Sequence, residues 1–477
     1  MIEALPPAGV PAEQVLAELR KLREDDLPTH GGRLFAYVYD PAVAGLDDLA
    51  HAAYAISAHV NGLDPTAFPS LLAMENALVG AAVKTLGGGP EAVGTITSGG
   101  TESLILAVKA ARDARPDVAS PRLVIPSTAH AAFAKAAHYL RVTLDVVPIT
   151  ADDLRADPAA MAAAITRETV LVAASAPSYA HGVVDPIPEI AALAAERGVR
   201  FHVDACFGGW VLPYLKRLGA DLPEFDLSVP GVTSISVDLH KYAYAAKGVS
   251  VLLYRDEALR LPQYFAHADW PGYTMVNPGI ASTRSGGPIA AALATMRYIG
   301  EQGYLELAGQ TRDAVRVLAD AVRATDGVHL YARPETTVVC LAADDGVDLF
   351  VLADELAALG WHTQPQLAYG KMAPTIHLTV TAAVAATAPG FAPDLAAAVL
   401  AARHPVELPP GLLELAGSLT TVTPEVIRGL VDGLGFTPGG PMAVVNTLLN
   451  AAPAALREAL LTGFLSLLQR PAGHGVG

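Results

Sequence analysis

Cysteine, charge and long apolar runs are all scarce in this chain of 477 residues. Its two cysteines, Cys206 and Cys340, are too few for the disulfide scaffold of a secreted domain, and their separation fits no zinc motif. Only 17% of the residues are charged, and the net charge of −16 argues against a nucleic-acid backbone as the main partner. These shortages disfavour the secreted, metal-binding and nucleic-acid-binding classes.

A positive mean hydropathy of +0.36 raises the question of a membrane span. Alanine supplies most of the excess, and no run reaches the roughly 18 uninterrupted apolar residues that a spanning helix needs. The most apolar stretch, 382–402, is interrupted by Pro389, Pro393 and Asp394. Residues 1–26 also lack the basic-then-apolar pattern of a signal peptide. We therefore expect a cytoplasmic protein with no membrane span, no metal site and two free, buried thiols.

What the chain does contain is a large hydrophobic fraction, 52% of all residues, which is enough for a sizeable core. Residues 1–70 are expected to form an N-terminal arm that begins with an amphipathic helix near 12–23. Residues 71–310 alternate between helices and apolar strands, which is typical of an α/β domain whose mainly parallel sheet is covered on both faces. Residues 311–477 are expected to form a smaller C-terminal α+β domain with a helical tail.

Hydrophobic periodicity and turn residues place the individual elements. In the large domain they predict helices at 70–86, 101–114 and 187–197, and strands at 94–97, 123–125, 169–174, 200–203, 234–237 and 249–254. In the small domain they predict a helix at 305–324, strands near 338–341 and 375–381, and tail helices at 424–434, 442–450 and 454–468.

The first candidate for chemistry is the segment Ser98-Gly99-Gly100-Thr101-Glu102-Ser103, between a predicted strand and an amphipathic helix. The two glycines allow a ligand to approach the backbone closely, and the N–H groups of the helix's first turn attract an anion. The segment lacks the lysine of a Walker A loop and the spacing of a dinucleotide fingerprint. Taken alone, it favours an ordinary turn before a helix.

Two charged residues stand at the ends of later strands. Asp204 follows the strand 200–203, and open α/β sheets bind their ligands at the carboxyl ends of parallel strands. Its carboxylate would either cap the next turn or pair with a cation such as a protonated pyridine nitrogen. Lys241 lies beyond the strand 234–237, and a lone lysine is usually a solvated surface charge. Desolvation and neighbouring cations would instead depress its pKa and make it a nucleophile.

These features together suit one cofactor, pyridoxal 5′-phosphate (PLP). PLP has a phosphate for the glycine-rich segment, a pyridine nitrogen for Asp204 and an aldehyde for Lys241. His130, after the strand 123–125, would lie flat on the ring, although by itself it suggests an ordinary loop histidine. The order of these residues on one α/β domain predicts an enzyme that breaks a bond at the α-carbon of an amine.

The same residues lie in longer motifs. The most specific is Asp238-Leu239-His240-Lys241-Tyr242-Ala243-Tyr244-Ala245-Ala246-Lys247-Gly248. The others are Thr97-Ser98-Gly99-Gly100-Thr101-Glu102-Ser103, Thr128-Ala129-His130, Ser175-Ala176-Pro177, His181-Gly182, His202-Val203-Asp204-Ala205-Cys206 and Pro230-Gly231-Val232-Thr233-Ser234-Ile235-Ser236. With these motifs the chain resembles, from about residue 35 to 436, the PLP-dependent sphingosine-1-phosphate lyases and, more distantly, the group II amino-acid decarboxylases of fold type I.

The resemblance implies a role for each matching residue. Lys241 would carry the cofactor through a Schiff base, Asp204 would keep the ring nitrogen protonated, and His130 would stack on the ring. The cofactor phosphate would be bound by Gly99, Gly100, Thr101 and His240. The substrate pocket would include Lys247, Asn61, Asp64 and Arg284, the last in a loop that reaches the partner's site. The family also implies a homodimer with shared active sites.

One departure bears on the substrate. The lyases have an Asn-x-Leu-His-Pro segment whose histidine lies at the substrate-phosphate pocket, whereas this chain has Asn61-Gly62-Leu63-Asp64-Pro65. A carboxylate near a phosphate dianion is repulsive, so Asp64 favours the decarboxylases, while the run around Lys241 favours the lyases. A milder departure is Ser285, which follows Arg284 where the lyases have proline.

The reaction therefore stays open between two carbon–carbon cleavages. One is decarboxylation of an amino acid, and the other is retro-aldol cleavage of a phosphorylated amino alcohol. A PLP-dependent aminotransferase is the alternative enzyme class, and it would require a keto acid. A non-catalytic PLP-fold binding protein is the least favoured reading, because Asp204, His130 and Lys241 are all present.

Overall fold

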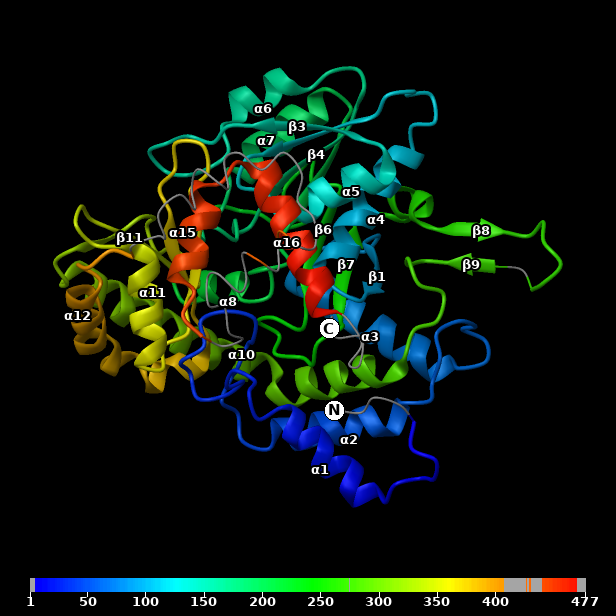
Figure 1. The fold of residues 1–477 in the computed structure, drawn as a ribbon. Helices are drawn as coiled ribbons and strands as arrows, with labels where there is room; N and C mark the ends of the chain where they lie inside the picture. Colours follow the sequence, from blue (N-terminus) through cyan, green and yellow to red (C-terminus); the bar gives the residue numbers. More distant parts are fainter. Residues whose placement is uncertain (1–4, 274, 407–425, 427–428, 430–439, 470–477) are drawn as a thin grey trace.

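The computed structural model (Figure 1) describes residues 5–273, 275–406, 426, 429 and 440–469. Its centre is a seven-stranded sheet in the order β1-β7-β6-β5-β4-β2-β3. Neighbouring strands are parallel from β6 to β3, and β7 is antiparallel to both β6 and β1. The strands are β1 (Val93–Thr97), β2 (Arg122–Pro126), β3 (Thr143–Val147), β4 (Thr169–Ser175), β5 (Arg200–Asp204), β6 (Ser234–Asp238) and β7 (Ser250–Tyr254). The expected α/β fold with a mainly parallel sheet is confirmed.

Helices cover both faces of this sheet, which explains why its strands are apolar throughout. In β4, Val172 and Ala174 pack into one core while Leu171 and Ala173 pack into another on the opposite face. One face is covered by α4 (Gly100–Asp113) and α5 (Ala132–Leu140), and the other by α3 (Pro69–Thr85), α6 (Pro158–Ala164), α7 (Ile187–Glu196) and α8 (Leu212–Arg217). Of these, α5, α6, α8 and the edge strand β3 were not among the elements expected from the sequence.

The small domain is built on a four-stranded antiparallel sheet in the order β10-β11-β13-β12. Its strands are β10 (Val328–Leu330), β11 (Val338–Ala343), β12 (Gln364–Gln366) and β13 (Thr375–Thr379). Helices α11 (Leu349–Ala358) and α12 (Phe391–Ala401) pack on it. The domains are joined by α10 (Gly286–Arg323), which is kinked at Gly300, so the boundary placed at residue 310 falls inside a helix.

The N-terminal arm contains α1 (Ala12–Leu22) and α2 (Leu46–Ser57), the first of which is the expected helix. The arm does not form a separate unit, because Phe35 is fully buried in the core of the small domain and stacks on Trp361 with ring centroids 5.8 Å apart. Beyond the large domain's core, the hairpin of β8 (Phe265–His267) and β9 (Met275–Asn277) projects outward from the molecule (Figure 1).

The C-terminal tail includes α15 (Ala443–Ala451) and α16 (Ala454–Leu468), which agree with two of the expected tail helices. The third, at 424–434, lies almost entirely outside the described residues. The Asp354 carboxylate of α11 accepts hydrogen bonds from the backbone N–H groups of Met442 (2.9 Å) and Ala443 (2.7 Å), which fixes the start of α15 on the small domain. Within the described part of the chain, no helix combines the length and apolar character needed to cross a bilayer.

Candidate active site

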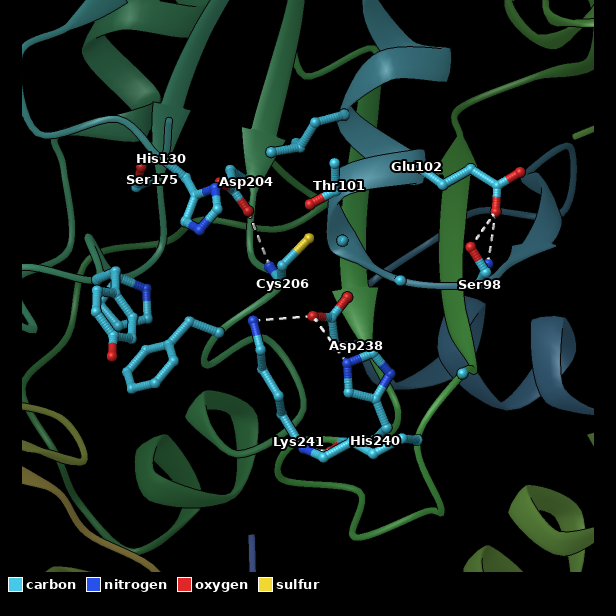
Figure 2. A pocket seen from close by; sticks show the side chains of 18 residues that line it. Ser98, Thr101, Glu102, His130, Ser175, Asp204, Cys206, Asp238, His240 and Lys241 are labelled. Carbon is cyan, nitrogen blue, oxygen red and sulfur yellow. Dashed lines mark hydrogen bonds and ion pairs between the residues drawn. The ribbon is translucent and has the colours of Figure 1, made fainter. Parts of the chain in front are cut away.

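The carboxyl ends of β4, β5 and β6 face the N-terminus of α4 across a pocket of about 480 Å³. This is the sheet edge where α/β folds place their ligands. Figure 2 shows Asp204, His130, Thr101 and Lys241 pointing into it from different elements. The predicted cofactor residues all line this one pocket: Gly99, Gly100, Thr101, His130, Asp204, His240 and Lys241.

The glycine-rich segment closes one end of the pocket as the start of α4. Gly100 admits no side chain, because a Cβ there would lie 2.9 Å from Cys206 Sγ and 3.1 Å from the Asp238 carboxylate. Glu102 holds the turn: its Oε2 accepts from the Ser98 N–H at 2.7 Å and from the Ser98 hydroxyl at 2.6 Å. The first-turn N–H groups of the 14-residue α4 therefore form a rigid anion-binding end.

Asp204 and His130 lie on the opposite side of the pocket. Asp204 ends β5 and is buried, and its Oδ1 accepts from the Cys206 N–H at 3.1 Å. His130 Nδ1 accepts from the Ala132 N–H at 3.1 Å, at the first turn of α5, which fixes the plane of the imidazole. A carboxylate and a flat ring held in this way suit a heteroaromatic ligand with a basic nitrogen.

Lys241 reaches the pocket from the loop after β6, and its Nζ lies 2.8 Å from Asp238 Oδ2. Burial lowers the pKa of Lys241, but Asp238, Cys206 and the nearby Asp204 outweigh it, so the pKa lies above its ordinary value. The expectation that its surroundings depress this pKa is wrong for the amine paired with Asp238. Asp238 is the functional residue that sequence reasoning missed, and its place three residues before the lysine was the available signal.

His240 completes this end of the pocket. Its Nδ1 donates to the Val249 carbonyl at 2.9 Å, and its Nε2 lies 3.6 Å from Asp238 Oδ2. Burial lowers the pKa of His240, and the positive neighbours Lys247 and Lys241 add to that effect against the opposing pull of Asp238. Because Nδ1 carries the single proton of the neutral imidazole, Nε2 is the ring atom left to face the pocket, and it can donate to an anion only in the protonated ring.

Comparison with known proteins agrees with this arrangement. Residues 28–344 match the family model described as the pyridoxal-dependent decarboxylase conserved domain. The chain belongs to this family. Residues 410–467 match a second model, described as the C-terminal putative HTH domain of pyridoxal-dependent enzymes.

Relatives that share about a third of their residues with this chain are sphingosine-1-phosphate lyases. The sphingosine-1-phosphate lyase of Arabidopsis thaliana is 35% identical over 444 residues, which cover 91% of this chain and 79% of that protein. The solved sphingosine-1-phosphate lyase of Burkholderia pseudomallei has a TM-score of 0.79 at 35% identity, covering 84% of this chain and 93% of that one. A Lactobacillus brevis glutamate decarboxylase (TM-score 0.74, 20% identity) shares the fold. The chain is therefore a PLP-dependent lyase, and the aminotransferase alternative is not favoured.

The pocket of this lyase fits PLP on its own geometry. It offers an anion-binding helix end beside Gly100, a buried carboxylate at Asp204 and a primary amine at Lys241, all on one cavity. When bound, PLP supplies an electron sink that weakens one bond at the α-carbon of an attached amine. Lys241 would hold the group through its aldehyde, Asp204 would keep a proton on its ring nitrogen, and the start of α4 with His240 would hold its phosphate. These roles stay predictions for this chain.

The residues predicted for the substrate are not all in this pocket. Lys247 lines it, with Nζ 3.3 Å from the His240 carbonyl oxygen and 5.0 Å from the ring centre of Tyr39. Asn61, Asp64 and Arg284 do not line it within one protomer. The Asp64 carboxylate accepts from the N–H and hydroxyl of Thr66, and these bonds lower its pKa. Arg284 forms a bidentate ion pair with Glu75 and lines an adjoining pocket.

A loop that the sequence analysis noted only as a motif forms the remaining wall. After β4, the loop carries Pro177 and Tyr179 into the pocket. Asp185 lies behind the pocket lining and joins the two ends of this loop. The buried Asp185 carboxylate accepts from the N–H groups of Ser175 (2.8 Å) and Ala156 (2.9 Å). Burial raises the pKa of Asp185 to about 6 despite these bonds.

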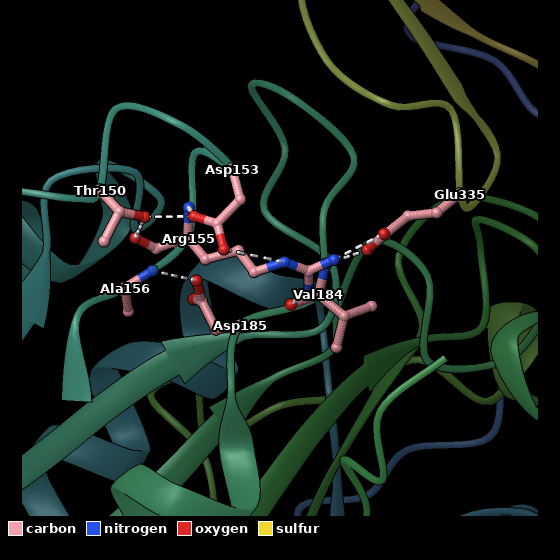
Figure 3. Close-up of polar contacts among 7 residues, drawn as sticks. All are labelled: Thr150, Asp153, Arg155, Ala156, Val184, Asp185 and Glu335. Carbon is pink, nitrogen blue, oxygen red and sulfur yellow. Dashed lines mark hydrogen bonds and ion pairs between the residues drawn. The ribbon is translucent and has the colours of Figure 1, made fainter. Parts of the chain in front are cut away.

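The small domain holds the far end of this loop (Figure 3). Glu335 Oε1 accepts from the Val184 N–H at 2.9 Å, and Glu335 Oε2 lies 2.6 Å from Arg155 Nη2. Arg155 also donates to the Val184 carbonyl. Tyr179 is stacked on His377 of β13, with ring centroids 4.4 Å apart. The position of Tyr179 therefore depends on both domains.

Proposed function

We propose that this lyase cleaves the Cα–Cβ bond of a phosphorylated, long-chain amino alcohol of the sphingosine-1-phosphate type, giving a long-chain aldehyde and phosphoethanolamine. The observation that carries the proposal is Lys247. It is a second cation in the catalytic pocket, beyond the residues that the cofactor would occupy, and a substrate phosphate needs such a partner. The lyases among the relatives, at 33 to 37% identity, support the same reaction.

The position of Asp64 does not oppose a phosphorylated substrate. Asp64 lies at an exposed turn, tied to Thr66, and does not line the pocket of its own protomer. Its charge is therefore no obstacle to a phosphate beside Lys247 of the same protomer. The decarboxylase reading, which depended on Asp64, has no other support in the pocket.

The residues of the pocket have different roles in this cleavage. Lys247 binds the substrate phosphate at the rim, while His130 and the wall that carries Tyr179 orient the α-carbon. The reaction takes a proton from the β-hydroxyl and returns one to the α-carbon. Lys241 Nζ, or an acid–base group beside it, moves these protons, and Asp238 stabilises the ammonium form of Lys241 at 2.8 Å.

A homodimer with shared sites is part of the proposal. Large apolar side chains are exposed on the N-terminal arm and the hairpin, where a monomer would leave them in water. They include Leu16, Leu19 and Leu22 on one side of α1, Ile56 in the last turn of α2, and Phe265 and Val276 on the β8–β9 hairpin. In the proposed dimer, the loop that carries Arg284 reaches the neighbour's pocket.

The proposal is tested by mass spectrometry of the products formed by purified, PLP-loaded enzyme. The substrates are offered separately: sphingosine-1-phosphate, unphosphorylated sphingosine, and a mixture of common amino acids. We expect an aldehyde and phosphoethanolamine from the first alone. An amine and CO₂ from an amino acid would overturn the proposal in favour of decarboxylation.

A further inference from the structure

A second chamber of about 310 Å³ adjoins the catalytic pocket. Two side chains, His130 and Tyr179, line both cavities, so the two spaces meet at the point where the α-carbon would be held. The outer walls of the chamber come from the 366–375 segment of the small domain, including Leu367, Met372 and Ala373. Its volume is in the range of small-molecule binding cavities.

This chamber carries no charge. None of the described residues that line it is Asp, Glu, Lys or Arg. Burial lowers the pKa of its one well-buried histidine, His181, to about 4, so that imidazole is neutral at physiological pH. The catalytic pocket, in contrast, is lined by Glu102, Asp204, Asp238, Lys241 and Lys247.

Several polar atoms of the residues that line the chamber are covered by protein or already paired. The Thr128 hydroxyl and His181 Nδ1 are covered by protein and have no hydrogen-bond partner. The Gln366 side-chain amide donates to the Ala180 carbonyl at 2.9 Å. A charged ligand would lose its water here without meeting an opposite charge among the described lining residues, whereas hydrocarbon gains by leaving water.

We propose that this chamber, bounded by Tyr179, His181, Leu367, Met372 and Ala373, binds the aliphatic tail of the substrate amine. The inference rests on the proposed function and adds where the non-reacting part of the substrate lies. The charged head stays with Lys247 in the catalytic pocket, and the chain passes between His130 and Tyr179 into the neutral space. Tail burial then helps to orient the bond to be broken, because the two ends of the substrate are fixed in different environments.

The chamber is held open by the fold. Thr336 donates to the Gly182 carbonyl at 2.6 Å, and Gly182, at a φ of +72°, packs so closely on β11 that a Cβ would lie 2.4 Å from Val338 Cβ. With the Gln366 bond, these contacts fix the 178–184 wall to the small domain. A ligand therefore meets a cavity already formed, which lowers the entropic cost of binding.

The first test measures binding without catalysis. Ala373 is exposed at the chamber wall, so Ala373→Trp fills the space without disturbing a core, and Lys371→Trp adds the same side chain to the same turn away from the chamber. Equilibrium dialysis of radiolabelled octanol is made with the PLP-loaded wild-type enzyme and both variants. We expect saturable octanol binding to wild type and Lys371→Trp and its loss in Ala373→Trp. Equal binding to all three proteins, or none to wild type, would overturn the proposal.

The second test uses turnover of phosphorylated amino alcohols with long and short tails. Each methylene buried is worth about 0.8 kcal/mol, so excluding several should lower the long-to-short ratio of kcat/KM roughly 100-fold in Ala373→Trp. Lys371→Trp should keep the wild-type ratio. A ratio near one in the wild type would contradict tail binding even if cleavage occurs. Absence of cleavage with every tail, combined with octanol binding, would instead contradict the proposed function and leave the chamber assigned to another neutral substituent.

Discussion

The catalytic pocket and the chamber beside it share two side chains and differ in almost everything else. The pocket holds ionisable groups from α4, β5 and the loop after β6, including the Lys241–Asp238 pair at 2.8 Å. The chamber has no Asp, Glu, Lys or Arg among its described lining residues, and several of its polar atoms are covered or bonded. Charge is concentrated where bonds change, and a neutral surface lies where a substrate only needs to be held.

The difference also has a structural origin. The pocket lies at a parallel sheet edge, where strand ends and a helix N-terminus converge and polar groups accumulate. The chamber lies between the large domain's 127–131 and 178–181 segments and a turn of the small domain, Leu367 to Ala373, so its walls are loops packed on two cores. Variants that alter one cavity and spare the other test this difference.

The largest effect is expected from Lys241→Ala. It removes the amine that would hold the cofactor and move protons, so turnover should fall on the order of 10³-fold or more. The visible absorption of the bound cofactor should be lost as well, while octanol binding in the chamber stays at the wild-type level. Absorbance spectra, product assays and dialysis on the same preparation check these outcomes. A variant that kept normal turnover would contradict the assignment of Lys241.

Much of this pocket could be predicted from the sequence because its residues follow strand ends in a fixed order. Gly100, Asp204 and Lys241 each come after an apolar strand, and parallel strands bring such positions to one edge. The pairing of Lys241 with Asp238 was missed, since which way a carboxylate points depends on packing around β6. The chamber could not be foreseen, because it needs Tyr179 and Ala373 together, and these are almost 200 positions apart in the chain.

The N-terminal arm and the predicted substrate residues also depend on contacts between distant parts of the chain. Local periodicity predicted α1, but nothing local indicates that Phe35 packs on Trp361, more than 300 positions later, in the core of the small domain. Asn61, Asp64 and Arg284 were placed near the substrate by resemblance, and within one protomer they lie outside the pocket. Their place near a substrate depends on the contact between two copies of the chain, which no local motif indicates.

A smaller effect is expected at Lys247. Partial desolvation at the rim, followed by the charge of Lys241, lowers the pKa of Lys247 to about 8. The ammonium form is present below that pH and lost above it, so the KM for a phosphorylated substrate should rise as the pH passes about 8. Lys247→Gln should raise KM roughly 10-fold at neutral pH, as expected for one charge-assisted bond, and should flatten the pH profile.

The control for this prediction is Lys84→Gln, which removes an exposed ammonium far from both cavities. Its KM and pH profile should match the wild type. A Lys247→Gln enzyme whose KM still rises above pH 8 would show that another group binds the phosphate. Octanol binding should be the same in both variants, because the chamber contains neither lysine.

The smallest effect on turnover is expected at the wall that the two cavities share. Glu335→Gln weakens the bonds to Arg155 and to the Val184 N–H, and replacing the charge should lower the free energy of unfolding by about 1–3 kcal/mol. Urea unfolding measures this difference, with Asp320→Asn as the control. Asp320 pairs with the exposed Arg323, so its substitution should change the free energy of unfolding by no more than about 0.5 kcal/mol. Equal free energies of unfolding for the two variants would mean that the Glu335 contacts do not stabilise this wall.

The central claim is that the charged pocket cleaves a carbon–carbon bond at the α-carbon of a phosphorylated amine. The most direct measurement is mass spectrometry of the products that the PLP-loaded enzyme forms from sphingosine-1-phosphate in D₂O. The account predicts a long-chain aldehyde and phosphoethanolamine that carries one solvent deuterium on the carbon next to nitrogen, and neither product with Lys241→Ala. Intact substrate after prolonged incubation, in an enzyme that releases CO₂ from an amino acid, would contradict it.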